Sequence, residues 1–295
     1  MCRRAQRPLH PAKVFQPHEA SVTDTRTVEL RQRFRTLHAS GCFVIPNPWD
    51  VGSARLLTGL GFQALATTSS GFAWSTGRRD NQIDVDDALA HMYAIAAAVD
   101  VPVNADFEGG FAIEPDDVAA NVSRAVENTS IAGLSIEDST GDAASPLFDF
   151  SLAVDRVAAA RDAIDRDESG VLLTARTEGF IAGRPDLDET LRRLTAFAEA
   201  GADCLYAPGI RTDEQILAVV RAARPKPVNI LVGAPFTTVD HLRELGVRRI
   251  SVGGALARTA WGGFLRAARE IAQQGSFAAL GDAVPFAELD GLFAK

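Results

Sequence analysis

The amino-acid sequence predicts an α/β fold, a single (β/α)8 TIM-type barrel with a helix before it and a helical extension after it. Short apolar runs alternate with amphipathic segments eight times along the chain, as strands and helices do in α/β proteins. The chain has 295 residues, and a barrel of this class typically takes about 250. One strand more or fewer would favour an open doubly wound sheet, whereas eight strands favour closure into a barrel.

The N-terminal segment differs in composition from the rest of the chain. Residues 1–25 carry basic side chains and prolines but no apolar periodicity. They lack the apolar core of about 7–15 residues that a secretion signal needs, and no amphipathic face repeats as in an organellar transit peptide. We therefore predict a disordered extension there and one folded unit over residues 26–295. Its first helix is expected at residues 27–39, ended by Gly41.

Eight apolar runs are expected to form the strands, because each is short and leads into a polar or glycine-containing segment. These runs lie at residues 42–46, 62–66, 101–105, 132–136, 171–175, 203–207, 227–232 and 249–252.

A helix is expected after each strand, and several helix boundaries are marked in the sequence. Glycine ends three of the segments, at Gly61, Gly201 and Gly246, and Pro115 suits the first turn of another. The stretch at residues 67–83 is expected to be a long loop. The helices are expected at residues 51–60, 84–98, 115–128, 150–164, 187–200, 212–223, 237–245 and 255–273.

The C-terminal segment, residues 277–295, is too apolar to remain in water without a cover. Seven large apolar side chains recur in it: Phe277, Leu280, Val284, Phe286, Leu289, Leu292 and Phe293. They must cover either the barrel or a neighbouring subunit, so we expect a homo-oligomer, a dimer or a tetramer.

Composition and charge exclude several classes of partner. The net charge is −8, which argues against nucleic acid, and no apolar run reaches the ~18 residues of a membrane span. The three cysteines, Cys2, Cys42 and Cys204, are odd in number and lack metal-site spacing. A disulfide framework is therefore not expected. We expect a cytoplasmic location, where the thiols stay reduced.

Acidic residues follow two neighbouring strands. Asp106 and Glu108 come after the third strand, and Glu137 and Asp138 after the fourth. Active sites of such barrels lie at the carboxyl ends of the strands, and Mg²⁺ prefers oxygen ligands. The alternative is a purely structural role, in which such acids cap the helices that follow. For acids after two adjacent strands, we favour a site for Mg²⁺ or Mn²⁺.

Other polar residues are expected at the same rim. Arg176 offers a planar fork for a carboxylate or phosphate. His91 and His241 fall in helical segments, no strand ends in lysine, and no nucleophile triad is visible, which argues against a Schiff-base aldolase. The Gly253-Gly254 pair suits either a phosphate or tight packing. The remaining rim candidates are Trp49, Asp50, Thr68, Ser69, Ser70, Asn104, Glu178, Tyr206 and Asn229.

Several motifs in order resemble the isocitrate lyase/phosphoenolpyruvate mutase superfamily over roughly residues 27–270. The motifs are Asn-Pro-Trp-Asp at 47–50, Asn-Ala-Asp-Phe-Glu-Gly-Gly at 104–110, Ile-Glu-Asp at 136–138, Ala-Arg-Thr-Glu at 175–178 and Ala-Gly-Ala-Asp at 200–203. The resemblance implies a Mg²⁺-dependent barrel that makes or breaks a C–C or P–C bond beside a carbonyl through an enolate. It also implies that the last helix is exchanged between subunits.

The resemblance further implies roles for individual residues. Asp106 and Glu137 correspond to the family's metal-shell acids, and Arg176 to the arginine that grips the substrate carboxylate. Asn104 stands where relatives keep an aspartate, a loss of charge that Glu108 could compensate. Asp80 corresponds to a catalytic-loop aspartate. Ser69 and Ser70 correspond to residues whose backbone amides stabilise an oxyanion. Trp49 and Asp50 correspond to the pocket wall.

The segment after the fourth strand departs from the family pattern. Isocitrate and methylisocitrate lyases carry Lys-Lys-Cys-Gly-His there, whereas residues 139–148 contain no lysine, cysteine or histidine. Isocitrate lyase activity is therefore not expected, and mutase activity finds no support.

The sequence thus predicts a Mg²⁺-dependent lyase that cleaves a C–C bond of a small 2-oxo or 2-hydroxy di- or tricarboxylate. Decarboxylation tolerates the missing gate, since water can protonate the product. A retro-aldol cleavage would need a base, for which Asp80, Glu178 and Tyr206 are candidates. The alternatives are a P–C bond enzyme of the phosphonopyruvate type, a catalytically inactive barrel that binds an oxo-acid, and a different metal-dependent barrel aldolase.

Overall fold

The computed structural model describes residues 24–166 and 168–294, and the predicted N-terminal extension lies almost wholly outside them. Eight parallel strands form one sheet in the order β1-β8-β7-β6-β5-β4-β3-β2, which confirms the barrel. The strands are β1 Phe43–Ile45, β2 Leu65–Ala66, β3 Val103–Asp106, β4 Gly133–Glu137, β5 Leu172–Arg176, β6 Cys204–Tyr206, β7 Val228–Leu231 and β8 Arg249–Ser251.

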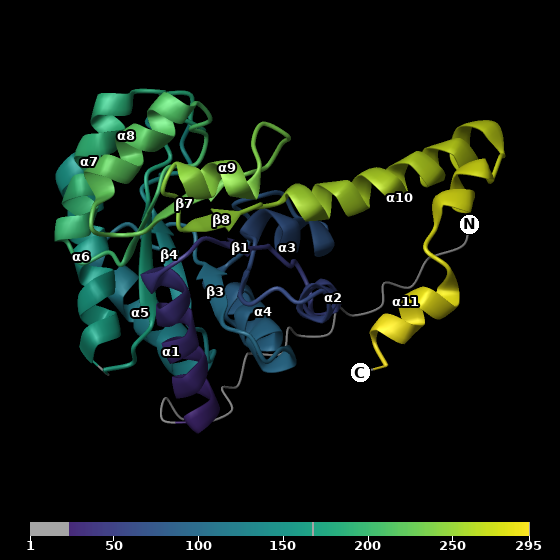
Figure 1. Ribbon diagram of the computed structural model, residues 1–295, viewed down its shortest axis with the longest axis horizontal. Helices are drawn as coiled ribbons and strands as arrows, with labels where there is room; N and C mark the ends of the chain where they lie inside the picture. The colour runs from purple at the N-terminus through teal and green to yellow at the C-terminus, as the bar shows by residue number, and fades with distance from the viewer. Residues whose placement is uncertain (1–23, 167, 295) are drawn as a thin grey trace, which may run out of the picture.

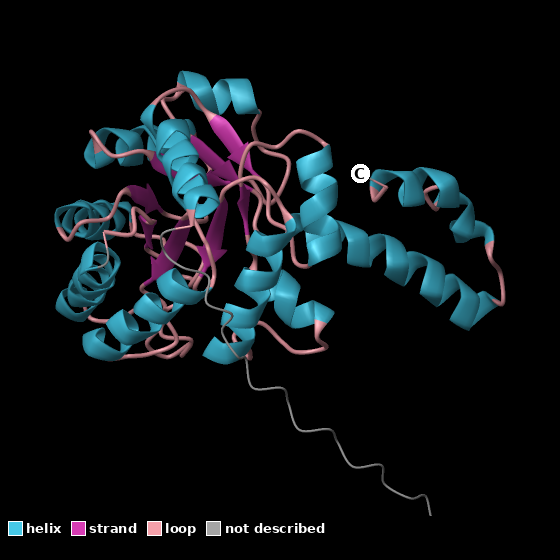
Figure 2. Cartoon of the chain, turned by 90° about the horizontal axis from the view of Figure 1, so that it is seen from below, coloured by secondary structure: helices cyan, strands magenta, loops and turns pink. Residues whose placement is uncertain are grey.

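Helices surround the strands, as Figure 2 shows from below. Six of the helices begin at a side-chain cap, as α4 does at Asp84 and α7 at Asp186. The helices are α1 Thr25–Ala39, α2 Val51–Gly59, α3 Ser69–Ser75, α4 Val85–Ala98, α5 Pro115–Asn128, α6 Phe150–Arg166, α7 Leu187–Glu199, α8 Asp213–Ala223, α9 Val239–Glu244, α10 Ala255–Gln274, the 3₁₀ helix η1 Ala278–Asp282 and α11 Phe286–Leu292.

The structure corrects two expected elements. The second strand is only Leu65–Ala66, because the backbone before Leu65 does not pair with β3. The expected loop at residues 67–83 contains helix α3. The hydroxyl of Thr68 begins this helix by accepting a hydrogen bond from Gly71 N at 3.3 Å. Ser69 and Ser70 therefore lie in a helical turn.

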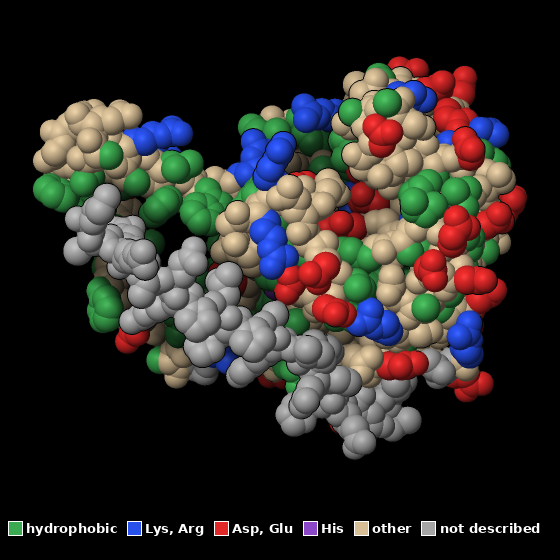
Figure 3. All heavy atoms as spheres, turned by 180° about the vertical axis from the view of Figure 1, so that it is seen from behind, with side chains coloured by type: hydrophobic (Ala, Val, Ile, Leu, Met, Phe, Trp, Pro, Cys, Tyr) green, Lys and Arg blue, Asp and Glu red, His purple; other side chains and the backbone are tan. Residues whose placement is uncertain are grey.

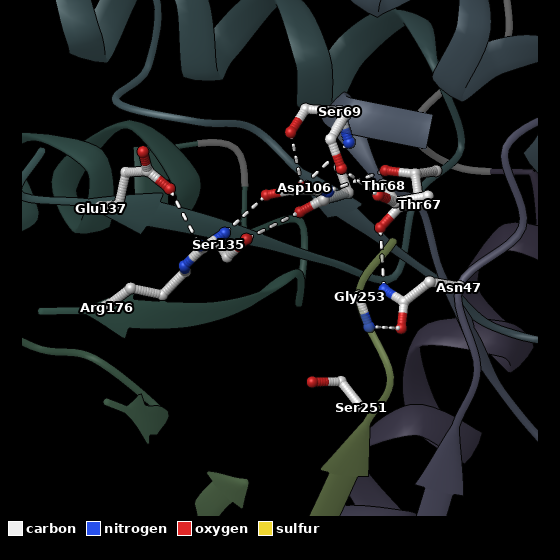
Figure 4. Close-up of polar contacts among 12 residues, drawn as sticks. Asn47, Thr67, Thr68, Ser69, Asp106, Ser135, Glu137, Arg176, Ser251 and Gly253 are labelled. Atoms are coloured by element: carbon white, nitrogen blue, oxygen red, sulfur yellow. Dashed lines mark hydrogen bonds and ion pairs between the residues drawn. The ribbon is translucent and has the colours of Figure 1, made fainter. Parts of the chain in front are cut away.

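Asn47 joins the two edges of the sheet where the barrel closes. Ala66 N donates to Pro46 O at 3.0 Å, which links β2 to the end of β1. The Asn47 amide donates to Thr67 O at 3.0 Å and accepts from the backbone N–H groups of Val252 and Gly253 at 2.9 and 2.8 Å (Figure 4). The Gly253 amide is thus already used in closing the barrel, which favours packing over phosphate binding there.

Replacing Asn47 with alanine is expected to lower the free energy of unfolding by about 2–4 kcal/mol. The change leaves buried backbone groups without partners at the closure, and each such group costs about 1–3 kcal/mol. Chemical denaturation measures the loss. The matched control is Asn128→Ala, which removes one hydrogen bond to Arg124 O inside α5. Equal losses in the two variants would show that Asn47 has no special role in closure.

Helix α1 covers the amino-terminal end of the barrel. Phe34 is fully buried there among Phe43, Ile45 and Leu172. Gly133 permits this approach, because a Cβ on it would lie 2.6 Å from Phe34 Cε1. Helix α1 therefore closes this end of the barrel, and the other end, at the carboxyl ends of the strands, is open to solvent.

His38 of α1 is buried against the rings of Phe34 and Phe43, at centroid distances of 4.5 and 5.1 Å. Burial, helped by the nearby Arg249 guanidinium, lowers the pKa of His38 from 6.5 to about 3. Between these values the unfolded chain binds a proton that the folded chain does not. The stability that His38 contributes is therefore lost as the pH falls below 6.5.

Replacing His38 with phenylalanine should remove this dependence, which amounts to about 1.4 kcal/mol per pH unit at its steepest. The measurement is the free energy of unfolding between pH 7 and 5, compared with His241→Phe, a change at a more exposed helical histidine. Parallel pH profiles for wild type and His38→Phe would contradict this account.

The C-terminal segment forms an arm. Helix α10 projects away from the barrel, and η1 and α11 fold back at its far end (Figure 1). Hydrophobic side chains gather along the arm in Figure 3. Phe264, Phe277 and Phe286 of this segment are 60%, 63% and 84% exposed. The arm thus does not bury these residues within one chain. No helix in residues 24–166 or 168–294 is long and apolar enough to cross a membrane.

Candidate active site

A polar cavity of about 330 Å³ opens at the carboxyl ends of the strands. It brings together most of the residues that the sequence predicted for the site. Eleven of them line it: Thr68, Ser69, Ser70, Asp80, Asn104, Asp106, Glu108, Glu137, Arg176, Glu178 and Tyr206. Five of these are carboxylic acids, and the cavity wall contains no histidine, cysteine or lysine among the described residues.

Arg176, at the end of β5, lies between Asp106 and Glu137 (Figure 4). Its guanidinium contacts Asp106 through Nη1 at 2.7 Å, Glu137 through Nη2 at 3.0 Å and Glu178 through Nε at 3.0 Å. Its Cζ also lies 5.1 Å from the ring centroid of Tyr206. The three acids come from different loops and strands, so one side chain fixes their arrangement.

Asp106 is held on its other side by helix α3. Its Oδ2 accepts hydrogen bonds from the backbone N–H and the hydroxyl of Ser69, at 3.0 and 2.9 Å. The backbone N–H of Asp106 donates to Thr67 Oγ1 at 2.8 Å. Ser70 bonds through its hydroxyl with Thr68 Oγ1 at 3.1 Å. Of the two serines predicted to bind an oxyanion, only Ser70 has a backbone N–H that Asp106 does not take up.

Asp138 points away from the cavity and positions Glu178. Its carboxylate accepts from Glu178 N at 2.9 Å and from Arg193 Nη1 at 3.1 Å. Asp138 is 2% exposed and is absent from the cavity wall. It therefore supports the site from behind.

The floor of the cavity is built by side chains that point into the barrel. Arg249 of β8 donates from Nη1 to Thr174 Oγ1 at 3.0 Å and to Asn104 Oδ1 at 3.4 Å, and from Nε to Asn229 Oδ1 at 3.0 Å. The Asn229 amide in turn donates to Ser251 Oγ at 2.9 Å. Asn104 and Arg249 line the cavity, whereas Asn229 lies beneath it.

Burial and crowding raise the pKa values of the acids. Desolvation, together with Asp106 and Asp80, raises the pKa of Glu108 to about 8. Desolvation and Asp106 also raise the pKa of Asp80. Burial raises the pKa of Glu137 well above its ordinary value against the attraction of Arg176. Glu108 is therefore protonated at neutral pH unless a further positive charge enters the cavity.

The donor chemistry of this cavity fits a hard divalent cation. Carboxylate oxygens of Asp106, Glu108 and Glu137 share one wall, and Glu108 Oε1 is buried without a hydrogen-bond partner. Among the described residues, no three acids, histidines or cysteines already converge in the way a preformed metal site requires. Arg176 keeps two of these acids apart on its separate nitrogens, Asp106 on Nη1 and Glu137 on Nη2.

Three predicted substrate-binding residues lie outside the cavity wall. Asp50 begins α2 as its N-cap, accepting from Ser53 N at 2.7 Å, which corrects its expected place in the pocket. Trp49 packs beside α3, and its backbone oxygen contacts His91 Nε2 at 3.0 Å. Asn229 is fully buried in the barrel. The sequence placed these residues near the rim but could not give their orientation.

Sequence reasoning missed two residues of the site. Arg249 stands in a short strand after Arg248, and the sequence did not show which of the two points inward. Asn47 was noted only as part of the Asn-Pro-Trp-Asp motif at 47–50. A polar residue at an inward position of a barrel strand is the signal that would have found Arg249, once the register was known.

Comparisons with known proteins give a consistent picture. The family model described as phosphoenolpyruvate phosphomutase matches residues 34–272. An uncharacterized protein of Mycobacterium tuberculosis is 34% identical over 87% of this chain and 94% of its own length. The oxaloacetate decarboxylase of Pseudomonas putida is 28% identical, over 77% of this chain and 79% of its own.

Solved structures agree with these matches. A Burkholderia cenocepacia protein classed as a lyase/mutase is 47% identical with a TM-score of 0.88, over 92% of this chain and 98% of its own. A phosphonopyruvate hydrolase, solved with oxalate and Mg²⁺, is 25% identical with a TM-score of 0.75, over 91% of this chain and 95% of its own.

Proposed function

The chain belongs to the phosphoenolpyruvate phosphomutase family, and from this premise we propose that it is a Mg²⁺-dependent carbon–carbon lyase. Its substrate is a small 2-oxo or 2-hydroxy di- or tricarboxylate. The observation that carries this proposal is a cavity at the carboxyl ends of the strands that five carboxylic acids line, three of them in contact with Arg176. The similarity to oxaloacetate decarboxylase supports the choice of bond.

The metal is proposed on the donor chemistry of the cavity and on the Mg²⁺ in the related hydrolase structure. Asp106, Glu137 and Glu108 would hold it, with Asn104 nearby. A divalent cation there supplies a positive charge that polarises the substrate carbonyl and stabilises the enolate.

Residues of the chain position the acids, stabilise the developing charge and transfer the proton. Arg176 fixes the positions of Asp106, Glu137 and Glu178. When the carbon–carbon bond breaks, its electron pair stays on the carbon beside the carbonyl, and the Ser70 amide donates to the oxygen that gains charge. From a 2-oxo acid the other fragment leaves as CO₂. From a 2-hydroxy acid it leaves as a carbonyl compound, and Asp80, Glu178 or Tyr206 takes the hydroxyl proton. The carbon then takes up a proton from water, or from Asp80 or Tyr206, whose pKa values are raised.

A substrate panel tests this proposal. Oxaloacetate, 2-methyl-substituted malates, 2-methylisocitrate and phosphonopyruvate, each of which releases pyruvate on cleavage, would be incubated with the enzyme and Mg²⁺, and pyruvate and phosphate measured. The proposal expects pyruvate without phosphate from at least one carboxylic acid. Phosphate from phosphonopyruvate alone would favour a P–C bond enzyme, which the family model and the related hydrolase also allow. No product from any compound would favour an inactive oxo-acid-binding barrel.

We also propose that the enzyme is a homo-oligomer in which the arm packs on a second copy. The exposed apolar side chains of α10, η1 and α11 support this proposal, because such a surface is costly in water. Light scattering of the purified chain tests it, with Phe286→Asp expected to shift the mass toward the monomer. A monomeric wild type would contradict it.

A further inference from the structure

We propose that Arg249 binds one carboxylate of the substrate at the floor of the cavity. This inference rests on the proposed lyase function. It narrows the substrate class to acids with at least two carboxylates, one of which reaches into the barrel. No motif in the sequence assigned Arg249 a role. The proposal follows from its position, its partners and the charges around it.

Arg249 is buried yet lines the cavity. It is 2% exposed, and its side chain enters the barrel from the first residue of β8. Two of its nitrogens, Nε and Nη1, donate to the neutral oxygens of Asn229, Asn104 and Thr174. Its third nitrogen, Nη2, has no hydrogen-bond partner among the described residues. The guanidinium is therefore oriented by three partners and retains free donors.

The charge of Arg249 is not balanced by the protein. No carboxylate within residues 24–166 and 168–294 forms a salt bridge with it. An arginine stays protonated in proteins, and burying its charge without a counter-charge is unfavourable. The other buried arginines with only neutral partners, Arg31 and Arg156, bond backbone oxygens and do not line this cavity. Arg249 alone among them faces the space where a substrate would lie.

Arg176, by contrast, is already satisfied. Its three nitrogens contact Asp106, Glu137 and Glu178 at 2.7–3.0 Å. A substrate carboxylate there would have to displace an acid, whereas one at Arg249 would gain a charge-assisted hydrogen bond without displacing any. The structure therefore favours Arg249 as the residue that binds a carboxylate.

This arrangement explains why position 104 has a neutral side chain. Its Oδ1 lies 3.4 Å from Arg249 Nη1, so an aspartate at this position would face the guanidinium. Such an aspartate would neutralise Arg249 and repel an incoming carboxylate. The asparagine keeps the hydrogen bond and leaves the positive charge available for the substrate.

The test is the binding of oxalate to the metal-free protein, measured by calorimetry in EDTA. Asn229→Asp places a carboxylate against Arg249 Nε without lining the cavity, and Ser251 can donate to it instead of accepting. Asn104→Asp does the same at Nη1. Each variant is expected to weaken oxalate binding roughly 10- to 100-fold, the range of a charge-assisted hydrogen bond.

The matched control is Asn81→Asp, which adds the same charge to the cavity wall without any hydrogen bond to Arg249. It should weaken oxalate binding by less than about fivefold. The proposal is wrong if wild type binds no oxalate in EDTA, if Asn229→Asp and Asn104→Asp bind it as wild type does, or if Asn81→Asp weakens it equally.

The two proposals fail separately. Oxalate binding that depends on Arg249, with no turnover in the substrate panel, would retain this inference and reject the lyase. Metal-dependent turnover with oxalate binding unchanged in the Asn229→Asp variant would retain the lyase and reject the inference.

Discussion

Replacing Arg176 with alanine is expected to reduce turnover by at least about 10³-fold and to destabilise the fold by about 3–5 kcal/mol. Removing one partner of a buried ion pair leaves the other charge uncompensated, and here three acids lose the same partner. The acids would then repel one another and lose the arrangement that Arg176 fixes, which accounts for the loss of turnover.

The pH dependence separates this cause from a general packing defect. Without the guanidinium, the folded-state pKa values of Glu137 and Glu178 rise further, so these groups are protonated at acidic pH. The stability gap between wild type and Arg176→Ala should therefore be larger at pH 8 than at pH 5. Urea unfolding at the two pH values measures it.

Arg176→Lys is the matched control, because it keeps the charge but lacks the planar fork that reaches three carboxylates. It should recover part of the stability and little of the turnover. A gap between wild type and Arg176→Ala that is the same at both pH values would contradict the electrostatic explanation.

Replacing Asp106 with asparagine is expected to lower turnover by at least about 100-fold and to weaken Mg²⁺ binding. An asparagine cannot accept at both ends, so it loses the contact with either Arg176 or Ser69. It also removes a negative charge from the proposed metal shell, and hard cations are held largely by such charges.

The control for this variant is Asp138→Asn, an acid of similar position that supports the site from outside the cavity. It should cost stability, because Arg193 loses a charged partner, but leave the affinity for Mg²⁺ close to that of wild type. Calorimetric titration with Mg²⁺ compares the two variants. Equal weakening in both would show that Asp106 is not a ligand.

The fold could be predicted from the sequence because eight apolar runs, each with a following helix, leave few other topologies. Helix α3 was missed because Thr67-Thr68-Ser69-Ser70-Gly71 is typical of a turn. Only the packed structure shows that Thr68 caps a helix there. Tertiary contacts decided the local structure in this segment, as they often do for polar residues with weak helix preference.

The acids of the site could be predicted for a topological reason, since residues after neighbouring parallel strands must meet at one rim. Their partners could not. Arg248 and Arg249 are adjacent, and a shift of one residue in β8 would exchange which of them points inward. The structure directs Arg248 outward, where it contacts Gly41 O, and Arg249 into the barrel. Likewise, the Asp50 carboxylate was expected in the pocket and instead begins α2.

The most direct test of the central claim is the rate of pyruvate release by wild type in Mg²⁺ and in EDTA, beside Arg176→Ala in Mg²⁺. The third reaction is needed because Mg²⁺ in solution can itself polarise a 2-oxo acid. If the acids around Arg176 are the active site of a metal-dependent lyase, pyruvate will form from one of the di- or tricarboxylates much faster with wild type and Mg²⁺ than in either of the other two reactions. Equal rates in EDTA, or equal rates with Arg176→Ala, would contradict that account.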